Sequence, residues 1–132
     1  MKENDIRIKN LESIKKNIKA YPIDFLNLLE NKNDNLDISL EVIETKSKKY
    51  SAKVFKDGKS IFLHSAYDPE KEANALIKEV EEDTDLIFIF GIGAGYLINA
   101  VKKLNVNMAV IEPSIKFFNL LIDNFKLEKI LE

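Results

Sequence analysis

The middle of the chain alternates hydrophobic and polar residues with a period of two. Apolar and polar residues alternate over 36–42 and again over 50–54, and this period predicts half-buried β-strands. Asp57-Gly58 follows the second run and precedes a third over 61–63. This dipeptide favours a type I′ turn, because such a turn requires positive φ at both central residues. We therefore expect a three-stranded antiparallel meander over 36–64.

The N-terminal segment has the spacing of helices instead. Apolar residues recur every three to four positions over 11–21, and Asn10 precedes them in the position of an N-cap. Pro22 should end this helix, because the residue before a proline is pushed away from α geometry. A second short helix is expected over 23–29, followed by a polar loop over 31–35.

Helices and strands are expected to alternate after the meander. Asp68-Pro69-Glu70 combines a capping aspartate, a proline for the first helical position and an acid in the first turn, and predicts a helix that continues to residue 80. The apolar run over 86–90 predicts a strand buried on both faces. A glycine-rich turn, a helix over 97–104, a second buried strand over 108–111 and a last helix from Ser114 follow.

The expected fold class is therefore α/β. N-terminal helices (1–35) and an antiparallel β-meander (36–64) are joined to a partial Rossmann-like, methyltransferase-like βαβα unit (65–132). Two parallel strands make a poor sheet by themselves, and a doubly wound fold normally has about five to seven. Either the meander completes the sheet, or these segments together form one N-terminal domain of a longer protein. We favour the second interpretation.

The composition of the chain excludes several classes of partner and of active site. Lys+Arg 20 against Asp+Glu 22 leaves a formal net charge of −2, without the basic excess of a nucleic-acid-binding domain. Cysteine is absent, which excludes disulfides, thiolate metal sites and cysteine nucleophiles. The chain has neither an apolar run long enough for a membrane span nor a signal-peptide core, so we expect a cytoplasmic protein with no nucleic-acid or membrane partner. Arg7 is the only arginine, so an arginine clamp on a phosphate would have to use it.

The glycine turn is the main candidate for a ligand site. Gly91, Gly93 and Gly95 lie between a strand and a helix, where backbone N–H groups and the helix dipole favour a phosphate or carboxylate. Glu112 ends the next parallel strand, where an acid commonly accepts hydrogen bonds from ribose hydroxyls. These four residues form a candidate nucleoside site, with a nucleotide or an S-adenosylmethionine-like molecule as its ligand.

The turn departs from two known glycine motifs. The dinucleotide motif G-x-G-x-x-G would have its third glycine where Tyr96 stands, which argues against NAD. The form G-x-G-x-G is more similar to the first motif of S-adenosylmethionine-dependent methyltransferases, but those enzymes usually carry an acid where this chain has Ile89. A tight turn that binds no ligand is the alternative.

His64 is the only histidine, and Ser65 and Asp68 lie close to it in the sequence. A hydrolase needs a base, a nucleophile and an orienting acid, and these three residues are of the right types. Adjacent strand residues point to opposite faces, however, so His64 and Ser65 are not expected to meet. We expect structural roles for them, with Asp68 as a helix cap, and no metal site.

Three segments together resemble a known family. LHSAYDPEKEA over 63–73, FGIGAGY over 90–96 and VIEP over 110–113 have an order and spacing similar to the N-terminal domain of the motility-associated factor (Maf) family, the bacterial flagellin glycosyltransferases. The resemblance covers roughly residues 36–132. The first segment is its most specific part, since generic methyltransferases lack it. The family landmarks there are His64, Ser65, Tyr67 and Asp68.

The resemblance implies a large cytoplasmic enzyme that transfers a nonulosonic acid from its CMP-activated form to Ser or Thr of flagellin. That chemistry is associated with a central domain downstream of the segment resembled here, so the chain is expected to be an accessory module without catalytic residues. Its expected partners are the remainder of its own polypeptide and flagellin. An exposed edge of the partial sheet would also offer a template for pairing between protomers. The alternative function is a nucleoside- or S-adenosylmethionine-binding half-domain of a methyltransferase-like enzyme.

Overall fold

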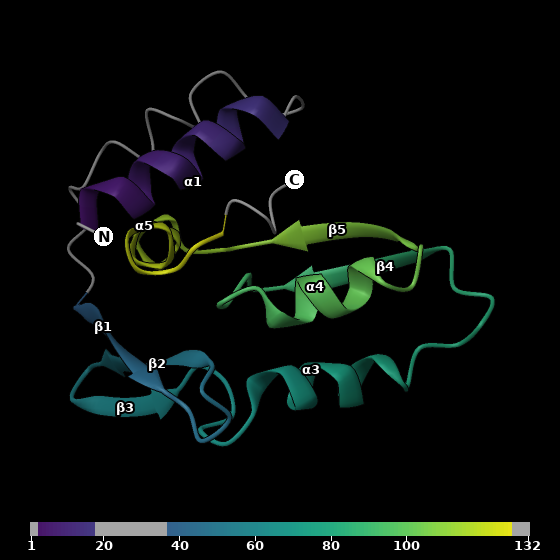
Figure 1. The fold of residues 1–132 in the computed structure, drawn as a ribbon, viewed down its shortest axis with the longest axis horizontal. Helices are drawn as coiled ribbons and strands as arrows, with labels where there is room; N and C mark the ends of the chain where they lie inside the picture. Colours follow the sequence, from purple (N-terminus) through teal and green to yellow (C-terminus); the bar gives the residue numbers. More distant parts are fainter. Residues whose placement is uncertain (1–2, 18–36, 128–132) are drawn as a thin grey trace.

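Two separate β-sheets and the helices around them make up the protein (Figure 1). The computed structural model describes residues 3–17 and 37–127. The described helices are α1 (Glu3–Asn17), α3 (Pro69–Ile77), α4 (Tyr96–Lys102) and α5 (Ile115–Asn124). The antiparallel sheet has the order β1 (Ile38–Glu44), β2 (Tyr50–Lys56), β3 (Lys59–Phe62), and the parallel sheet consists of β4 (Leu86–Phe90) and β5 (Asn107–Ile111). The mixed α/β class is confirmed.

The predicted meander is confirmed in its strands and in its turn. In the register of the sheet, Val54 lies opposite Leu40 of β1 and opposite Ile61 of β3. Asp57 and Gly58 connect β2 to β3 with φ angles of 51° and 72°, both positive as a type I′ turn requires. The meander forms a sheet of its own, so the alternative in which it completes the parallel sheet is wrong.

Two of the predicted helix starts are confirmed by their caps. Asp68 Oδ1 accepts a hydrogen bond of 3.0 Å from the N–H of Lys71, and Pro69 is the first residue of α3. Ser114 Oγ accepts one of 3.1 Å from the N–H of Phe117 at the start of α5. α3 ends at Ile77, before the residue 80 that the apolar spacing predicts.

The prediction that Asn10 caps a helix is wrong. α1 begins before it at Glu3, and the Asn10 side chain has no exposed surface. Its Nδ2 donates to the carbonyl oxygens of Ile122 and Phe125, both at 2.7 Å, and its Oδ1 accepts from the N–H of Leu127 at 2.8 Å. The last carbonyls of a helix have no partner within it. Asn10 therefore satisfies the end of α5 from a neighbouring helix.

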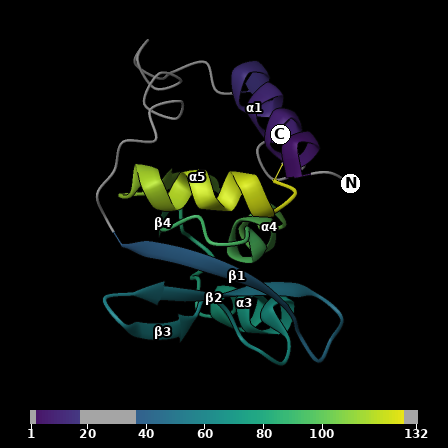
Figure 2. The same cartoon turned by 90° about the vertical axis from the view of Figure 1, so that its left-hand side faces the viewer.

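Arg7 adds a second link between α1 and α5, which lie side by side in both views (Figures 1 and 2). Its guanidinium donates to Asp123 Oδ1 at 2.6 Å and to Asn119 Oδ1 at 2.9 Å. The arginine that could have clamped a phosphate is therefore engaged inside the fold. The predictions for residues 18–35, a helix end at Pro22, a short helix and a polar loop, lie outside the described residues.

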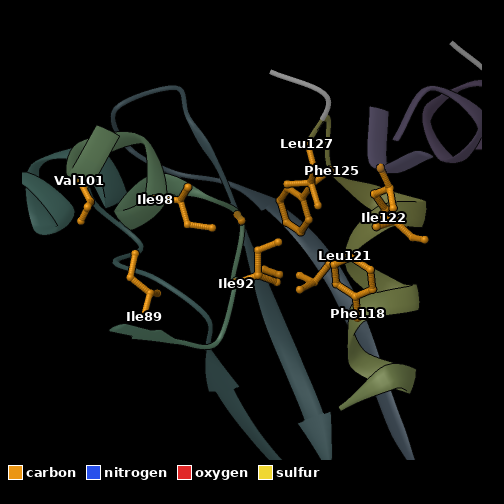
Figure 3. Close-up of a cluster of buried hydrophobic side chains, with 12 residues drawn as sticks. Ile89, Ile92, Ile98, Val101, Phe118, Leu121, Ile122, Phe125 and Leu127 are labelled. Atoms are coloured by element: carbon orange, nitrogen blue, oxygen red, sulfur yellow. The ribbon is translucent and has the colours of Figure 1, made fainter. Parts of the chain in front are cut away.

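One apolar core connects α1, both sheets, α4 and α5 (Figure 3). Ile92 of the glycine turn is 6% exposed and lies between the side chains of α4 and those of α5. Burial of the Ile92 side chain thus fixes the position of the glycine turn. The other buried members of the core come from α1, β2, β4, the glycine turn, α4, α5 and the segment after it: Ile14, Ala52, Ile89, Ala94, Ile98, Val101, Phe118, Leu121, Ile122, Phe125 and Leu127.

The prediction that the first parallel strand is buried on both faces is wrong. Ile89 points into the core and is 3% exposed, whereas Leu86, Phe88 and Phe90 on the opposite face are 46%, 68% and 76% exposed. Ile111 is the register partner of Phe90 on β5 and is 44% exposed. We call these four exposed side chains the apolar sheet face. The described helices supply the core on the Ile89 side only.

Candidate functional site at the glycine turn

The glycine turn leads from the carboxyl end of β4 into α4, next to the carboxyl end of β5 (Figure 1). Gly91, Gly93 and Gly95 have φ angles of 93°, 55° and 89°. Only glycine adopts such angles freely. The predicted glycines lie close to Glu112 in the structure. A Cβ added to Gly91 would be 3.9 Å from Glu112 Oε2.

The backbone N–H groups of this turn are largely used by acceptors of the protein itself. The N–H of Gly91 donates to the carbonyl of Ile111 at 2.7 Å, as an extension of the parallel ladder. The N–H of Ile92 donates to Glu112 Oε2 at 3.1 Å. The N–H of Ala94 donates to His64 Nε2 at 2.9 Å, and that of Gly95 to the carbonyl of Ile92 at 3.2 Å. A phosphate would have to displace these acceptors to bind here.

Glu112 closes the turn as a carboxylate acceptor. Besides the N–H of Ile92, it accepts a hydrogen bond of 3.3 Å from the N–H of Ser114 through Oε1. A carboxylate at this point repels an anion and accepts hydrogen bonds from hydroxyl groups. The predicted pairing of Glu112 with a ribose therefore remains chemically suitable, whereas binding of a phosphate by the turn does not.

His64 connects the meander to the glycine turn. Its backbone N–H donates to Ser51 Oγ at 3.2 Å, and its ring packs edge-on against Tyr96 with the ring centroids 5.3 Å apart. Because Nε2 accepts from Ala94, the ring proton belongs on Nδ1, which faces Glu72 Oε1 at 3.7 Å. The histidine thus works as a neutral hydrogen-bond acceptor.

The close approach of His64 also explains a glycine. A Cβ on Gly93 would lie 2.7 Å from His64 Nε2 and 2.8 Å from Cε1, closer than such atoms approach in proteins. The imidazole ring thus occupies the space that a side chain at position 93 would need. The glycine at position 93 is therefore required by the protein's own histidine.

Tyr96 stands where a dinucleotide motif has its third glycine, and its side chain has a definite partner. Its hydroxyl donates to the carbonyl of Tyr50 at 2.6 Å and accepts from the N–H of the same residue at 3.1 Å. Burial raises the pKa of the phenol, while the bond to the Tyr50 backbone opposes the shift. Tyr96 therefore ties α4 to the start of β2, a role that the sequence analysis missed because the two residues are far apart in the chain.

Ser65, Tyr67 and Asp68 do not form a hydrolytic site with His64. Ser65 Oγ accepts from the N–H groups of Tyr67 and Asp68, both at 3.2 Å, and so shapes the loop before α3. The Tyr67 ring is 65% exposed and lies 4.2 Å below the ammonium group of Lys46. The expectation of structural roles agrees with these contacts for Ser65 and Asp68.

Within residues 3–17 and 37–127, histidine, aspartate and glutamate side chains form no group of three that could hold a metal ion. Among the helices of the same ranges, none is long and apolar enough to cross a membrane. Comparisons of the chain with protein families, curated proteins and solved structures gave no match.

The contact between His64 and Gly93 predicts a specific coupling. Gly93→Ala should lower the free energy of unfolding by about 2–4 kcal/mol, because the new Cβ meets the imidazole at a positive φ. Gly58→Ala is the matched control, since Gly58 also has positive φ but nothing within 4 Å of the added carbon. It should cost only about 1–2 kcal/mol. Urea unfolding measures both losses.

The double variant Gly93→Ala with His64→Ala should recover part of the loss, because it removes the clash. Two additive effects in this double-mutant cycle would contradict the proposed contact.

The buried imidazole also predicts a pH dependence of stability. Burial lowers the pKa of His64 from its usual 6.5, and the nearby Glu72 carboxylate only partly opposes this shift. The unfolded chain therefore binds a proton that the folded chain does not. The contribution of the neutral His64 to the free energy of unfolding is complete above about pH 6.5. It is lost as the pH falls below that value, by at most about 1.4 kcal/mol per pH unit.

Urea unfolding between pH 7.5 and 5 measures this slope. His64→Gln keeps a side chain that can accept from Ala94 and has no titration in this range, so it should flatten the slope. An unchanged slope in the variant would assign it to other groups, since the chain has one histidine.

Proposed function

We propose that the chain is the N-terminal accessory domain of a Maf-type flagellin glycosyltransferase, with sugar transfer carried out by a downstream domain of the same polypeptide. The observation that carries the proposal is the apolar sheet face of Leu86, Phe88, Phe90 and Ile111, which is 44–76% exposed. Parallel sheets occur almost only with both faces covered. The described residues cover one face of β4 and β5 and add no third strand at either edge.

The kind of cover follows from the geometry of the sheet. Parallel strands need a crossover connection, usually a helix, and right-handed crossovers place helices on the faces of the sheet. Further strand–helix units would therefore supply both missing components, strands for the free edges and helices for the apolar sheet face. This completion is what a Rossmann-like unit contains, and it supports a position at the start of a larger α/β assembly.

A covalent continuation suits this face better than a second copy does. Two five-residue strands present a face of only about 16 by 10 Å. A specific interface between separate proteins buries about 800 Å² on each partner. A segment of the same polypeptide needs much less area, because its tether raises the effective concentration.

The engagement of His64, Glu112 and Asp68 by backbone N–H groups supports an accessory role. His64 accepts from a backbone N–H, Glu112 accepts from two, and Asp68 caps a helix. These three candidate acids and bases thus already serve the fold. We carry over the transfer of a nonulosonic acid from a CMP-sugar, the partner flagellin and the cytoplasmic location from the family resemblance alone.

One observation favours a second candidate function, a nucleoside- or S-adenosylmethionine-binding half-domain. Glu112 lies at the carboxyl end of β5 beside the glycine turn, the position at which α/β proteins bind a ribose. The exposed Phe90 next to it could contact a base. The engaged N–H groups of the turn argue against this alternative.

A genetic experiment tests the proposed function. Deletion of the whole gene in its host should leave flagellin at its unmodified mass, as read by mass spectrometry, and the intact gene should restore the glycosylated mass. The gene with Phe88→Asp and Phe90→Asp should fail to restore it, because both charges would be buried under the helices that cover this face. Normally glycosylated flagellin in the deletion strain would contradict the proposal.

The 132-residue chain provides the control for that variant. The free energy of unfolding of the isolated chain with Phe88→Asp and Phe90→Asp should lie within about 1 kcal/mol of the parent's, since both side chains are largely exposed there. Ile89→Ala between them should cost the isolated chain about 2–4 kcal/mol, because Ile89 is buried.

Amide NMR separates the two candidate functions. Titration of the labelled chain with S-adenosylhomocysteine and with CMP, each to millimolar concentration, should leave the amides of Gly91, Gly93, Gly95 and Glu112 unshifted, because the turn is closed by its own acceptors. Saturable shifts at these amides that Glu112→Gln weakens would instead establish the nucleoside site.

A further inference from the structure

The outer edge of β3 differs from the rest of the meander in what it exposes. β3 pairs with β2 on one side only, and no other described strand lies beyond it. All four of its residues are exposed, and two of them are large and apolar: Ile61 at 67% and Phe62 at 54%. Because successive strand residues point to opposite faces, both faces of this edge carry exposed apolar surface.

The unpaired backbone groups of this edge can be assigned. The N–H of Leu63 donates to the carbonyl of Ala52 at 2.8 Å. Leu63 and every second residue before it therefore direct their backbone N–H and C=O groups toward β2. In an antiparallel pair the intervening residues direct their N–H and C=O groups away from the partner. The groups on the free edge are therefore those of Ser60 and Phe62.

A hollow lies beside the edge on its inner face. It has a volume of about 480 Å³ between the meander and α5, and Val54, Ile61, Leu63 and Phe117 contribute most of its apolar lining. Lys56 and Lys59 lie at the same hollow. A side chain of an added strand would find apolar surface here, with ammonium groups close by.

The outer face of the same edge is aromatic and cationic. Phe55 and Phe62 are both exposed, and the Lys53 ammonium group lies 5.6 Å from the centroid of the first ring and 5.9 Å from that of the second. Lys53 has Glu41 as its register partner on β1, and Asp57 lies in the turn. Three lysines against these two acids leave the edge with an excess of positive charge.

We propose that the free edge of β3 is a strand-addition site for an extended, acidic peptide segment of a partner protein, with apolar residues at alternate positions. Main-chain hydrogen bonds to Ser60 and Phe62 would provide affinity, and pockets on alternate faces would provide selectivity, as in other cases of β-augmentation. The inner hollow takes the apolar side chains, and the acidic side chains that alternate with them lie on the outer face beside Lys53. The site lies on the antiparallel sheet and does not depend on the proposed function.

Charge favours an acidic peptide over a second copy of this chain. Pairing of two β3 edges about a two-fold axis would bring Lys53, Lys56 and Lys59 of both copies to one sheet. Each copy would bring the same excess of positive charge to the shared sheet, so the two edges repel each other. An acidic strand turns the same lysines into favourable contacts.

A peptide titration tests the site. A short blocked peptide of alternating valine and glutamate should give saturable amide shifts at Ser60 and Phe62 of the labelled 132-residue chain and should slow hydrogen exchange at these two amides. Ser60→Pro removes an outward N–H without breaking the ladder to β2, and should weaken binding about tenfold or more. Ser60→Ala is the matched control, because it keeps the N–H, and should bind like the parent.

The charge part of the proposal has its own variant. Lys53→Glu should weaken the valine–glutamate peptide about tenfold and should favour a peptide of alternating valine and lysine. This variant also keeps the test decisive if Ser60→Pro fails to fold. Equal binding of both peptides by the parent, or no saturable shift at Ser60 and Phe62, would overturn the proposal. Concentration-dependent dimerisation through β3 would overturn it as well.

Discussion

The hydrogen bond from the N–H of Ala94 to His64 Nε2, 2.9 Å long and partly buried, connects the segment after β3 to the glycine turn after β4. A buried N–H without an acceptor costs about 1–3 kcal/mol, so the turn after β4 needs this partner. The histidine follows the end of β3, and its N–H donates to Ser51 Oγ on the neighbouring strand β2, which fixes its position. Gly93 leaves room for the ring. The meander and the glycine turn are therefore interdependent.

The same principle holds at the opposite end of the fold. Asn10 is fully buried, and its amide meets two carbonyls at the end of α5 and one N–H beyond it. A buried polar network in which each member is satisfied specifies one arrangement of its elements, because any other arrangement leaves a group unpaired. His64, which the sequence offers as a candidate catalytic base, thus positions a turn, and Asn10 positions a helix.

Local signals were sufficient to predict the parts of the fold that depend on neighbouring residues. The Asp57-Gly58 turn and the cap at Asp68 involve partners within a few positions, and both are found. Asn10 was misassigned because its partners lie more than one hundred positions away. In a sequence, an asparagine that caps its own helix has the same neighbours as one that hydrogen-bonds to the end of another helix.

The candidate site shows the same limit. Spacing alone predicted that the three glycines and Glu112 lie together, and they do. Spacing could not show that the free space at Gly93 is filled by His64, because His64 lies about thirty positions earlier, in the segment after β3. The continuous apolar run of β4 predicted that both faces avoid water, but a sequence does not state which segment covers which face. The exposure of Phe88 is therefore the most informative departure from expectation.

The two exposed apolar regions differ in charge, and this difference separates their roles. The apolar sheet face of β4 and β5 consists of four uncharged side chains, as in a permanently buried core. The β3 edge mixes Ile61 and Phe62 with lysines, as in the polar and charged rim of an interface that forms and dissociates. Charged groups give such an interface its selectivity and its rate of association. The first region is thus suited to completing a fold, and the second to recognising a partner once the fold is complete.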